Sequence, residues 1–426
     1  NDMTALTRRH FGLVLGAGAA TLAMPAYLRS QGKPKVVVIG GGAGGATAAR
    51  YIAKDSEGAI DVTLIDESNK YTTCFFSNLY LGGYRDFNSI THGYDKLESN
   101  YGIKKVTGRA KSVDRAAKTV TMEDGSTIPY DRLVIAPGID FVWDSVNGYS
   151  EEASKVAPHA WKAGPQTELL KSKLDAVENG QTIIMVAPPN PYRCPPGPYE
   201  RVSMMAHVLK KKGLKDAKII VLDTKEKFSK QALFQEGWQK YYQGMIEWYA
   251  PSVHGGIKSV DVGAGTVTTD LDTFKGAMLN IIPAQKAGAI AAAAGVANDS
   301  GFCPIDASSM RSTMDENIFV IGDASIAGAM PKSAFSANSQ AKVAAMNVRG
   351  DLIKSKVFPA KYSNTCWSLI ETDDGVKVGA QYSPADGKIA ANSTFISQTK
   401  EEDALRKANY EESVGWYTGI VTDIFG

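Results

Sequence analysis

The stretch KVVVIGGGAGG, residues 35–45, decides the fold of this chain. A β-branched apolar run predicts a buried strand, and the alanine-rich residues after the glycines predict a helix. The glycines fit the G-x-G-x-x-G pattern, in which the first permits a tight turn, the second admits a pyrophosphate and the third lets helix and strand pack closely. Phosphates bind at the N-terminus of such a helix. We therefore expect a dinucleotide site that includes Gly40, Gly42, Ala43 and Gly45.

A second predicted strand, residues 61–65, ends at Asp66. This acid lies about 20 residues beyond the glycines, where a carboxylate holds a ribose hydroxyl in dinucleotide-binding units. Strand, glycine turn, helix and acid together predict a bound dinucleotide rather than a glycine-rich turn without a ligand.

The N-terminal segment, residues 1–32, reads as an export signal. Arg8 and Arg9 precede Phe11 and an apolar run, and small residues follow at Ala23 and Ala26. Paired arginines favour the twin-arginine route, which predicts a periplasmic mature protein. An uncleaved amphipathic helix is the alternative.

Composition narrows the function. The chain has a net charge of +2 and contains 22% charged residues, so nothing favours binding to nucleic acid. No stretch after the signal is apolar for long enough to form a membrane helix. No C-x-x-C-H motif occurs, so we predict that this chain attaches no c-type haem, and we predict no metal site. Three disulfide pairings are possible among Cys74, Cys194, Cys303 and Cys366.

The loop after the predicted strand 182–186 argues against NAD(P). A nicotinamide reductase would carry a second glycine fingerprint here, but residues 188–198 contain six prolines. Proline has no N–H to offer a phosphate. The same loop holds Cys194 and leads to Glu200 at the start of a helix predicted over 200–211. A thiol beside a carboxylate suits sulfur chemistry, and a rigid structural turn explains these residues equally well.

A second flavin signature follows much later. The predicted strand 317–321 ends in Gly322 and Asp323, whose carboxylate is expected to bind the ribityl chain of FAD. Residues 330–340, with Lys332, open a helix to about residue 348 whose positive end would face the flavin pyrimidine. Cys74 follows the second strand of the first domain, so we expect it near the isoalloxazine end, with a buried structural cysteine as the alternative.

These elements predict an α/β fold with two dinucleotide-binding, Rossmann-like domains of the disulfide-reductase type and a small α+β C-terminal domain. We assign residues 33–146 and 285–354 to the FAD-binding domain and residues 147–284 to a second domain without an NAD site. Residues 355–426 are expected to form a separate unit. Residues 257–281 are expected to be a β-meander, and residues 287–294 a helical stretch.

The chain resembles the flavoprotein subunit of flavocytochrome c sulfide dehydrogenases over essentially its whole mature length. The resemblance rests on GGGAGGATAA, YTTCFFSN, YDRLVIAPG, PHAWKAG, YRCPPGPYER, VIGDASIAGAMPKSAFSANSQ and SNTC. It implies that Cys74 carries FAD through a thioether and that Cys194 and Cys366 form a redox-active disulfide that sulfide attacks. It also implies that Glu200 is an acid/base and Trp416 an aromatic neighbour of the flavin. Electrons would then pass to a c-type cytochrome subunit, and the resemblance implies that this partner chain carries the haem and that residues 355–426 form the interface domain.

Two other functions are considered. A sulfide:quinone oxidoreductase at the membrane surface would need an apolar or amphipathic C-terminal anchor, and the polar tail 411–426 counts against one. A non-catalytic flavin electron-transfer partner would keep its function after Cys194→Ser.

Overall fold

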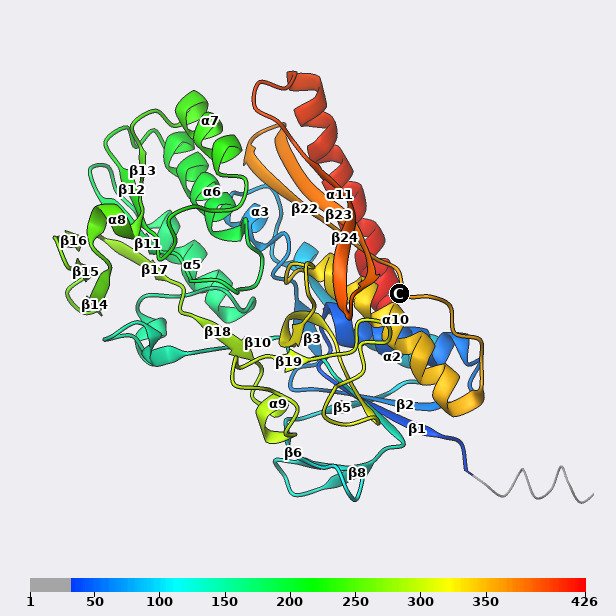
Figure 1. Cartoon of the computed structure of the whole chain (residues 1–426). Coiled ribbons are helices and arrows are strands. Elements are labelled where there is room, and N and C mark those ends of the chain that lie inside the picture. Colours follow the sequence, from blue (N-terminus) through cyan, green and yellow to red (C-terminus); the bar gives the residue numbers. More distant parts are fainter. Residues whose placement is uncertain (1–31) are drawn as a thin grey trace, which may run out of the picture.

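The computed structural model describes residues 32–426 as three units that pack around one another (Figure 1). The predicted export signal, residues 1–32, lies outside the described residues except for its last residue. The chain forms an FAD-type domain, a second domain with a parallel sheet, and a C-terminal antiparallel sheet with one long helix. The predicted fold class is confirmed.

The first domain is built on a five-stranded parallel sheet in the order β20-β9-β1-β2-β5. Its strands are buried because helices and a meander cover both faces. Strand β20 comes from far along the chain and pairs with β9. The strands are β1 (Lys35–Ile39), β2 (Asp61–Asp66), β5 (Lys104–Thr107), β9 (Arg132–Ile135) and β20 (Ile318–Val320).

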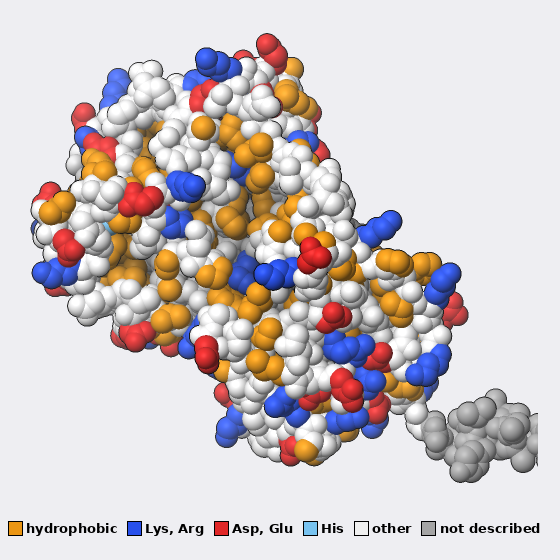
Figure 2. Space-filling model, in the orientation of Figure 1, with side chains coloured by type: hydrophobic (Ala, Val, Ile, Leu, Met, Phe, Trp, Pro, Cys, Tyr) orange, Lys and Arg blue, Asp and Glu red, His pale blue; other side chains and the backbone are white. Residues whose placement is uncertain are grey.

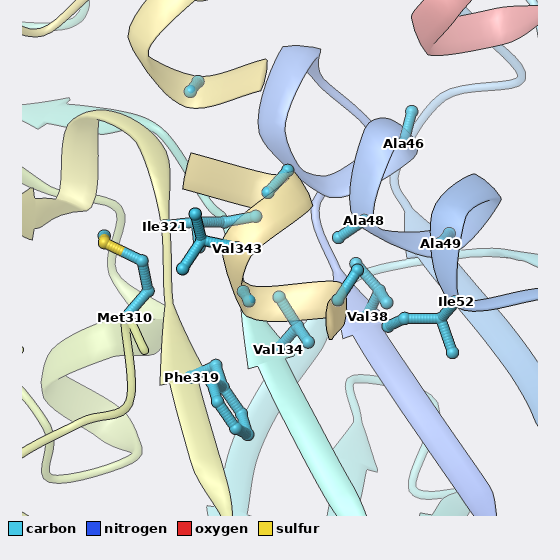
Figure 3. Packing of buried hydrophobic residues seen from close by; sticks show 14 of the residues in the cluster. Val38, Ala46, Ala48, Ala49, Ile52, Val134, Met310, Phe319, Ile321 and Val343 are labelled. Atoms are coloured by element: carbon cyan, nitrogen blue, oxygen red, sulfur yellow. The ribbon is translucent and has the colours of Figure 1, made fainter. Parts of the chain in front are cut away.

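Helices α2 (Ala43–Asp55) and α10 (Ala334–Ile353) pack against each other over this sheet (Figure 1). Small residues on α2 permit the close approach, since Ala46, Ala48 and Ala49 are fully buried. These alanines belong to the same buried cluster as the larger side chains Val343 and Ile321 (Figure 3). This packing fixes the N-termini of both helices on the same edge of the sheet.

Two glycines of the fingerprint are sterically required. Gly40 has φ +102°, and a Cβ there would lie 2.0 Å from the carbonyl oxygen of Ala136. A Cβ on Gly45 would lie 1.7 Å from the carbonyl oxygen of Gly40. The predicted tight turn and the close helix–strand contact are therefore present.

The second domain has a four-stranded parallel sheet in the order β13-β12-β11-β17. Strand β17 corrects the expected meander over 257–281, because it pairs in parallel with β11 and only the three strands before it form the antiparallel meander. The sheet strands are β11 (Thr182–Val186), β12 (Lys218–Leu222), β13 (Ile246–Tyr249) and β17 (Met278–Ile281), and the meander strands are β14 (Ile257–Asp261), β15 (Thr266–Thr269) and β16 (Thr273–Lys275).

Helix α6 (Gly197–Lys211) begins three residues before the predicted start at Glu200. Pro198 lies in its first turn, where no backbone N–H is needed for an intrahelical bond, so proline is tolerated there. The stretch predicted as helical over 287–294 is shorter, because β18 (Gln285–Ala287) pairs with β10 (Ile139–Phe141) and leaves only α9 (Ile290–Ala293).

The C-terminal unit does not stand apart as expected. Strands β22 (Tyr362–Glu371), β23 (Asp374–Ala385) and β24 (Lys388–Ile396) form an antiparallel sheet beside α11 (Asp403–Phe425) (Figure 1). Tyr362 and Phe425 are part of the core of the first domain, and Ile370 is part of the core of the second. The tail therefore joins both domains.

Shorter elements connect these units. No helix in the described part of the chain is long and apolar enough to cross a membrane. The connecting elements include β3 (Lys70–Thr72), α3 (Ser77–Leu81), β4 (Thr91–Gly93), α4 (Asp95–Tyr101), β6 (Ala110–Asp114), β7 (Thr119–Met122), β8 (Thr127–Pro129), α5 (Pro165–Asp175), α7 (Gln231–Tyr241), α8 (Pro251–His254), β19 (Cys303–Pro304) and β21 (Ser325–Ile326).

Candidate active site

The nucleotide end of the site lies where β1 turns into α2. Asp66 is fixed there by two backbone amides, since Gly41 N donates to its Oδ2 at 2.8 Å and Ser68 N donates to its Oδ1 at 2.9 Å. The first-turn amides of α2 have no partner within the helix and point toward the same edge. The turn and the carboxylate together fit the adenosine half of a dinucleotide.

Asp323 lies at the other end of this edge, in the short helix η4 (Gly322–Ala324). Its Oδ2 accepts a 2.6 Å hydrogen bond from Arg193 Nε, whereas its Oδ1 is buried without a partner among residues 32–426. Ser336 Oγ and Trp367 Nε1 are likewise buried without partners in that range. Buried polar atoms without hydrogen bonds are costly, so these three fit a site that a polar cofactor completes.

Lys332 stabilises the loop that carries Asp323. Its Nζ donates to the carbonyl oxygens of Asp323 and Ser325, both at 2.8 Å, and lies 4.0 Å from the ring centroid of Phe302. Burial lowers the pKa of Lys332 to about 8, although the Asp323 carboxylate opposes this effect. The lysine therefore shapes the loop beneath the expected flavin.

Cys74 follows β3 and is partly buried. Burial raises the pKa of its thiol, the guanidinium of Arg193 lowers it, and the carboxylate of Asp323 raises it further. Cys74 therefore lies in the electric field of the Arg193–Asp323 ion pair. Arg193, which the sequence analysis did not single out, directly precedes Cys194.

Cys194 lies in the proline-rich loop in a left-handed conformation, with φ +56°. Its amide donates to the carbonyl oxygen of Lys332 at 2.7 Å, and its own carbonyl accepts from Gly197 N at the start of α6. Burial raises the pKa of this thiol well above the usual value, and Cys366 and Glu200 add to the effect. The fold thus brings the three predicted catalytic residues together.

Cys366 lies in the middle of β22. Asn364 Nδ2 donates to its Sγ at 3.4 Å, and Ser333, the N-cap of α10, donates to Asn364 Oδ1 at 2.6 Å. All four cysteines are free thiols in this structure, and Cys303 is buried. The Cys194–Cys366 disulfide therefore stays a prediction.

Glu200, in the first turn of α6, is held by neutral donors. Asn78 Nδ2 donates to its Oε1 at 3.0 Å, and Leu369 N donates to its Oε2 at 2.7 Å. Burial raises the pKa of Glu200. A cavity of about 10 Å³ borders Glu200 and the β22 residues Trp367 and Ser368. Glu200 also interacts electrostatically with Cys194 and Cys366, so a carboxyl group with a raised pKa is available there for proton exchange.

Lys230 is the second residue that the sequence analysis missed. It precedes α7 and is 6% exposed, and its Nζ donates to the carbonyl oxygen of Cys366 and to Ser368 Oγ, both at 2.9 Å. No motif surrounds it in the sequence. Only the packing of α7 against β22 brings it to the thiols.

Trp416 on α11 joins the parts of the site. Its ring lies 5.8 Å from that of Phe75, which follows Cys74, and 5.0 Å from that of Trp367, which follows Cys366. It also stacks with Phe335 at the start of α10, at 6.0 Å. The hollow between the second domain and the C-terminal sheet is rich in apolar side chains (Figure 2).

The corresponding edge of the second domain is filled by protein. Asp223, directly after β12, is fully buried and accepts hydrogen bonds from Tyr199 Oη at 2.5 Å and from Trp248 Nε1 at 2.9 Å. Lys225 pairs with it at 2.8 Å. The acid in the position to hold a second ribose is therefore occupied by side chains.

Family models match three segments of the chain. Residues 167–283 match the central part of the "Sulfide dehydrogenase [flavocytochrome c] flavoprotein chain", and residues 359–425 match "Flavocytochrome c sulphide dehydrogenase, flavin-binding". Residues 34–172 match "Pyridine nucleotide-disulphide oxidoreductase".

Individual relatives agree with these matches. A flavocytochrome c sulfide dehydrogenase flavoprotein chain from Chlorobaculum thiosulfatiphilum is 47% identical over 47 residues, which are 96% of that sequence and 11% of this chain. The sulfide-quinone reductase of Aquifex aeolicus is 32% identical over 183 residues, 42% of this chain and 40% of that protein. The solved sulfide:quinone oxidoreductase of Aquifex aeolicus has the same fold, with a TM-score of 0.74, 19% identity and coverage of 92% and 91% of the two chains.

Proposed function

The chain belongs to the family of flavoprotein chains of flavocytochrome c sulfide dehydrogenases, and we propose that it oxidises sulfide at the Cys194–Cys366 pair beside bound FAD. The observation that carries the proposal is the convergence of three chain segments on one site. The proline-rich loop brings Cys194, β22 brings Cys366, and α6 brings Glu200.

The residues of the first domain would hold the cofactor. Gly40, Gly42, Ala43 and Gly45 would receive the pyrophosphate, and Asp66 the ribose. Gly322 and Asp323 would bind the ribityl chain, with Lys332 beneath them and Trp416 beside the flavin ring. The partnerless Oδ1 of Asp323 supports this assignment. We propose that Cys74 carries the flavin through a thioether.

The sulfur chemistry would begin with the pair joined as a disulfide. Hydrosulfide attacks one sulfur, a new S–S bond forms, the Cys194–Cys366 bond breaks, and the other cysteine leaves as a thiolate with the negative charge. No electrons leave the two residues in this step. Glu200, whose pKa is raised by burial, would take the proton of H₂S or return one to the released thiolate. FAD, when bound, supplies a two-electron acceptor for the reduced pair and can release electrons singly.

The acceptor of these electrons would be a c-type cytochrome subunit, which is the partner that a flavoprotein chain of the flavocytochrome c family implies. We further propose export by the twin-arginine route and a periplasmic location, on the basis of Arg8, Arg9 and the apolar run after them.

NAD(P) would not reduce this protein. The loop at the second sheet offers prolines where amides would bind phosphate, and Asp223 is already bonded to Tyr199, Trp248 and Lys225. A nucleotide would have to displace these buried partners.

A quinone-reducing function at a membrane surface has less support. The apolar residues Tyr417, Ile420, Ile424 and Phe425 of α11 are buried in the protein. The exposed positions of α11 carry mostly charged or small residues, including Lys407, Glu411 and Glu412. Such a helix presents no apolar face to a bilayer.

The test is anaerobic mixing of the FAD-loaded protein with sulfide, followed by addition of either a c-type cytochrome or a soluble quinone analogue. We expect sulfide to bleach the flavin and the cytochrome to be reduced faster than the quinone, while NADH leaves the flavin oxidised. Reduction of the quinone alone would favour a quinone oxidoreductase. A flavin that sulfide does not bleach would favour the non-catalytic electron carrier. Co-purification of a c-type cytochrome would identify the partner.

A further inference from the structure

Lys230 is a buried cation whose hydrogen bonds within the described part of the chain go to neutral groups. Its two hydrogen-bond acceptors, the carbonyl oxygen of Cys366 and Ser368 Oγ, are both neutral. Among residues 32–426 it forms no salt bridge, in contrast to Lys225, which pairs with Asp223 at 2.8 Å. An ammonium group has three donors, so one N–H of Lys230 is left for a further acceptor. Burial of an unpaired charge is strongly unfavourable, so such a group calls for a compensating anion.

The nearby carboxylate does not fill this role. Glu200 contributes to the electrostatics of Lys230, but both of its oxygens are directed to Asn78 and to the amide of Leu369. Burial lowers the pKa of Lys230 to about 8, and Cys366 is the group that most opposes this effect, followed by Glu200 and Cys194. Sulfur at Cys366 is therefore the anion best placed to balance the lysine.

We propose that Lys230 is the cation that balances the negative charge on the sulfur of Cys366 once its bond to Cys194 is open. The proposal rests on the proposed function for the reaction that opens the bond. When hydrosulfide or a thiol reductant breaks the disulfide, a negative charge enters a partly buried site. Lys230 lies against the backbone of Cys366 and would favour the thiolate over the protonated thiol.

The groups around Cys366 agree with a role of Lys230 in stabilising the thiolate of this residue. Burial raises the pKa of the Cys366 thiol, and Lys230 is the group that most strongly lowers it, followed by the hydrogen bonds from Asn364 and Ser333. Glu200 from α6 raises it, and Tyr382 from β23 also interacts with this sulfur. At Cys194, by contrast, Lys230 opposes the larger raising effects of burial, Cys366, Glu200 and Cys74. Lys230 thus acts mainly on Cys366.

The test is the pH dependence of alkylation of Cys366 in the reduced holoprotein, measured by peptide mass spectrometry with a small iodoacetamide reagent. Lys230→Gln keeps an N–H donor but removes the positive charge. We expect the pH midpoint of Cys366 alkylation to rise by at least one pH unit in this variant. Alkylation at a fixed pH below both midpoints would then be at least tenfold slower. Lys230→Arg should stay close to wild type. Lys225→Gln removes another largely buried lysine, outside the site, and should leave the midpoint unchanged.

An unchanged midpoint in a folded Lys230→Gln protein would overturn the proposal, as would an equal shift in Lys225→Gln. A measurement on the wild type does not depend on how the variants fold. With lysine labelled by ¹³C at Cε, the Lys230 resonance should titrate near pH 8 in the reduced protein and at lower pH when the pair is a disulfide, because the coupling is reciprocal. A Lys230 titration that is the same with the pair reduced and with the pair joined as a disulfide would also overturn the proposal.

These measurements read the thiol and the lysine directly. If sulfide fails to bleach the flavin but Lys230→Gln still shifts the Cys366 midpoint, the proposed function fails and this inference survives. If sulfide is oxidised but Lys230→Gln leaves the Cys366 midpoint unchanged, the proposed function survives and this inference fails.

Discussion

The amide of Cys194 donates a 2.7 Å hydrogen bond to the carbonyl oxygen of Lys332. This contact joins the proline-rich loop of the second domain to the segment that precedes α10 of the first. The neighbouring ion pair between Arg193 and Asp323, at 2.6 Å, crosses the same boundary. The thiol on the loop is therefore fixed relative to the residues that would hold the flavin, although it belongs to another domain.

The first prediction concerns the attachment of FAD. If Cys74 holds the flavin covalently, acid precipitation of the wild type will leave the yellow colour in the pellet, and Cys74→Ala will release it to the supernatant. Cys303→Ala is the matched control, since Cys303 is buried in β19 and has no expected role. A colourless wild-type pellet would rule out the thioether.

The second prediction concerns the two reactive cysteines. Cys194→Ser and Cys366→Ser should each abolish bleaching of the flavin by sulfide, because either change removes one partner of the disulfide. The loss should exceed about 100-fold in stopped-flow absorbance, while Cys303→Ser should react at the wild-type rate. Bleaching that persists in either serine variant would show that sulfide reacts elsewhere.

The third prediction concerns Glu200. Its pKa is raised by burial above the value of about 4.3 found in unfolded chains. The folded state then binds this proton more tightly, so the contribution of Glu200 to the free energy of unfolding is fully present below pH of about 4.3. It falls as the pH rises through the folded pKa, by about 1.4 kcal/mol for each pH unit by which the folded pKa exceeds the unfolded one.

Glu200→Gln cannot titrate, so urea unfolding between pH 4 and 8 should show a flatter profile for this variant than for the wild type. We also expect kcat/KM for sulfide to fall by about 10²-fold or more, as for other general acids and bases. Parallel unfolding profiles would mean that the pKa of Glu200 is not raised in the folded protein.

The fourth prediction concerns a contact between all three units. His207 Nδ1 of α6 lies 2.5 Å from Glu371 Oε1 at the end of β22, and Tyr84 Oη of the first domain lies 3.4 Å from the same oxygen. Burial alone would raise the pKa of Glu371, but the hydrogen bonds from His207 and Thr372 N outweigh it and bring the pKa to about 2. The carboxylate therefore stabilises the fold above pH of about 4.3, and this stabilisation is lost as the pH falls toward 2.

Glu371→Gln should lower the free energy of unfolding at pH 7 by about 1–3 kcal/mol, because it weakens a buried, charge-assisted contact. The control is Glu412→Gln, which removes only a half-exposed pair with Lys377 and should cost less than about 1 kcal/mol. Equal losses in chemical denaturation would show that the junction adds no stability of its own.

The sequence predicted the elements whose signals are local. The fingerprint glycines, the strand that ends at Asp66 and the Gly322-Asp323 turn each combine a hydrophobic run with a steric or charge requirement. The lack of a second glycine fingerprint was also visible in a few adjacent residues, since residues 188–198 contain six prolines. These features follow from a few adjacent residues, so their predicted positions agree with the structure.

Some residues reach the site only through tertiary packing, and no sequence motif marks their positions. Lys230 reaches Cys366 only because α7 lies beside β22, and Arg193 meets Asp323 across a domain boundary. The tail, residues 355–426, was expected to form a separate unit. Only the fold shows that Phe425 completes the core of the first domain.

The position of Asp423 has a consequence for biosynthesis. Three residues before the last residue of this sequence, it accepts hydrogen bonds from Tyr51 of α2 and Asn338 of α10 and pairs with Lys342. When the ribosome has made β1 and α2, strand β20 of the same sheet and the helices α10 and α11 that pack against α2 have not yet been translated. Vectorial synthesis therefore leaves the nucleotide half without these neighbours until α11 has been translated, and nascent chains arrested before and after α11 should differ in their capture of FAD.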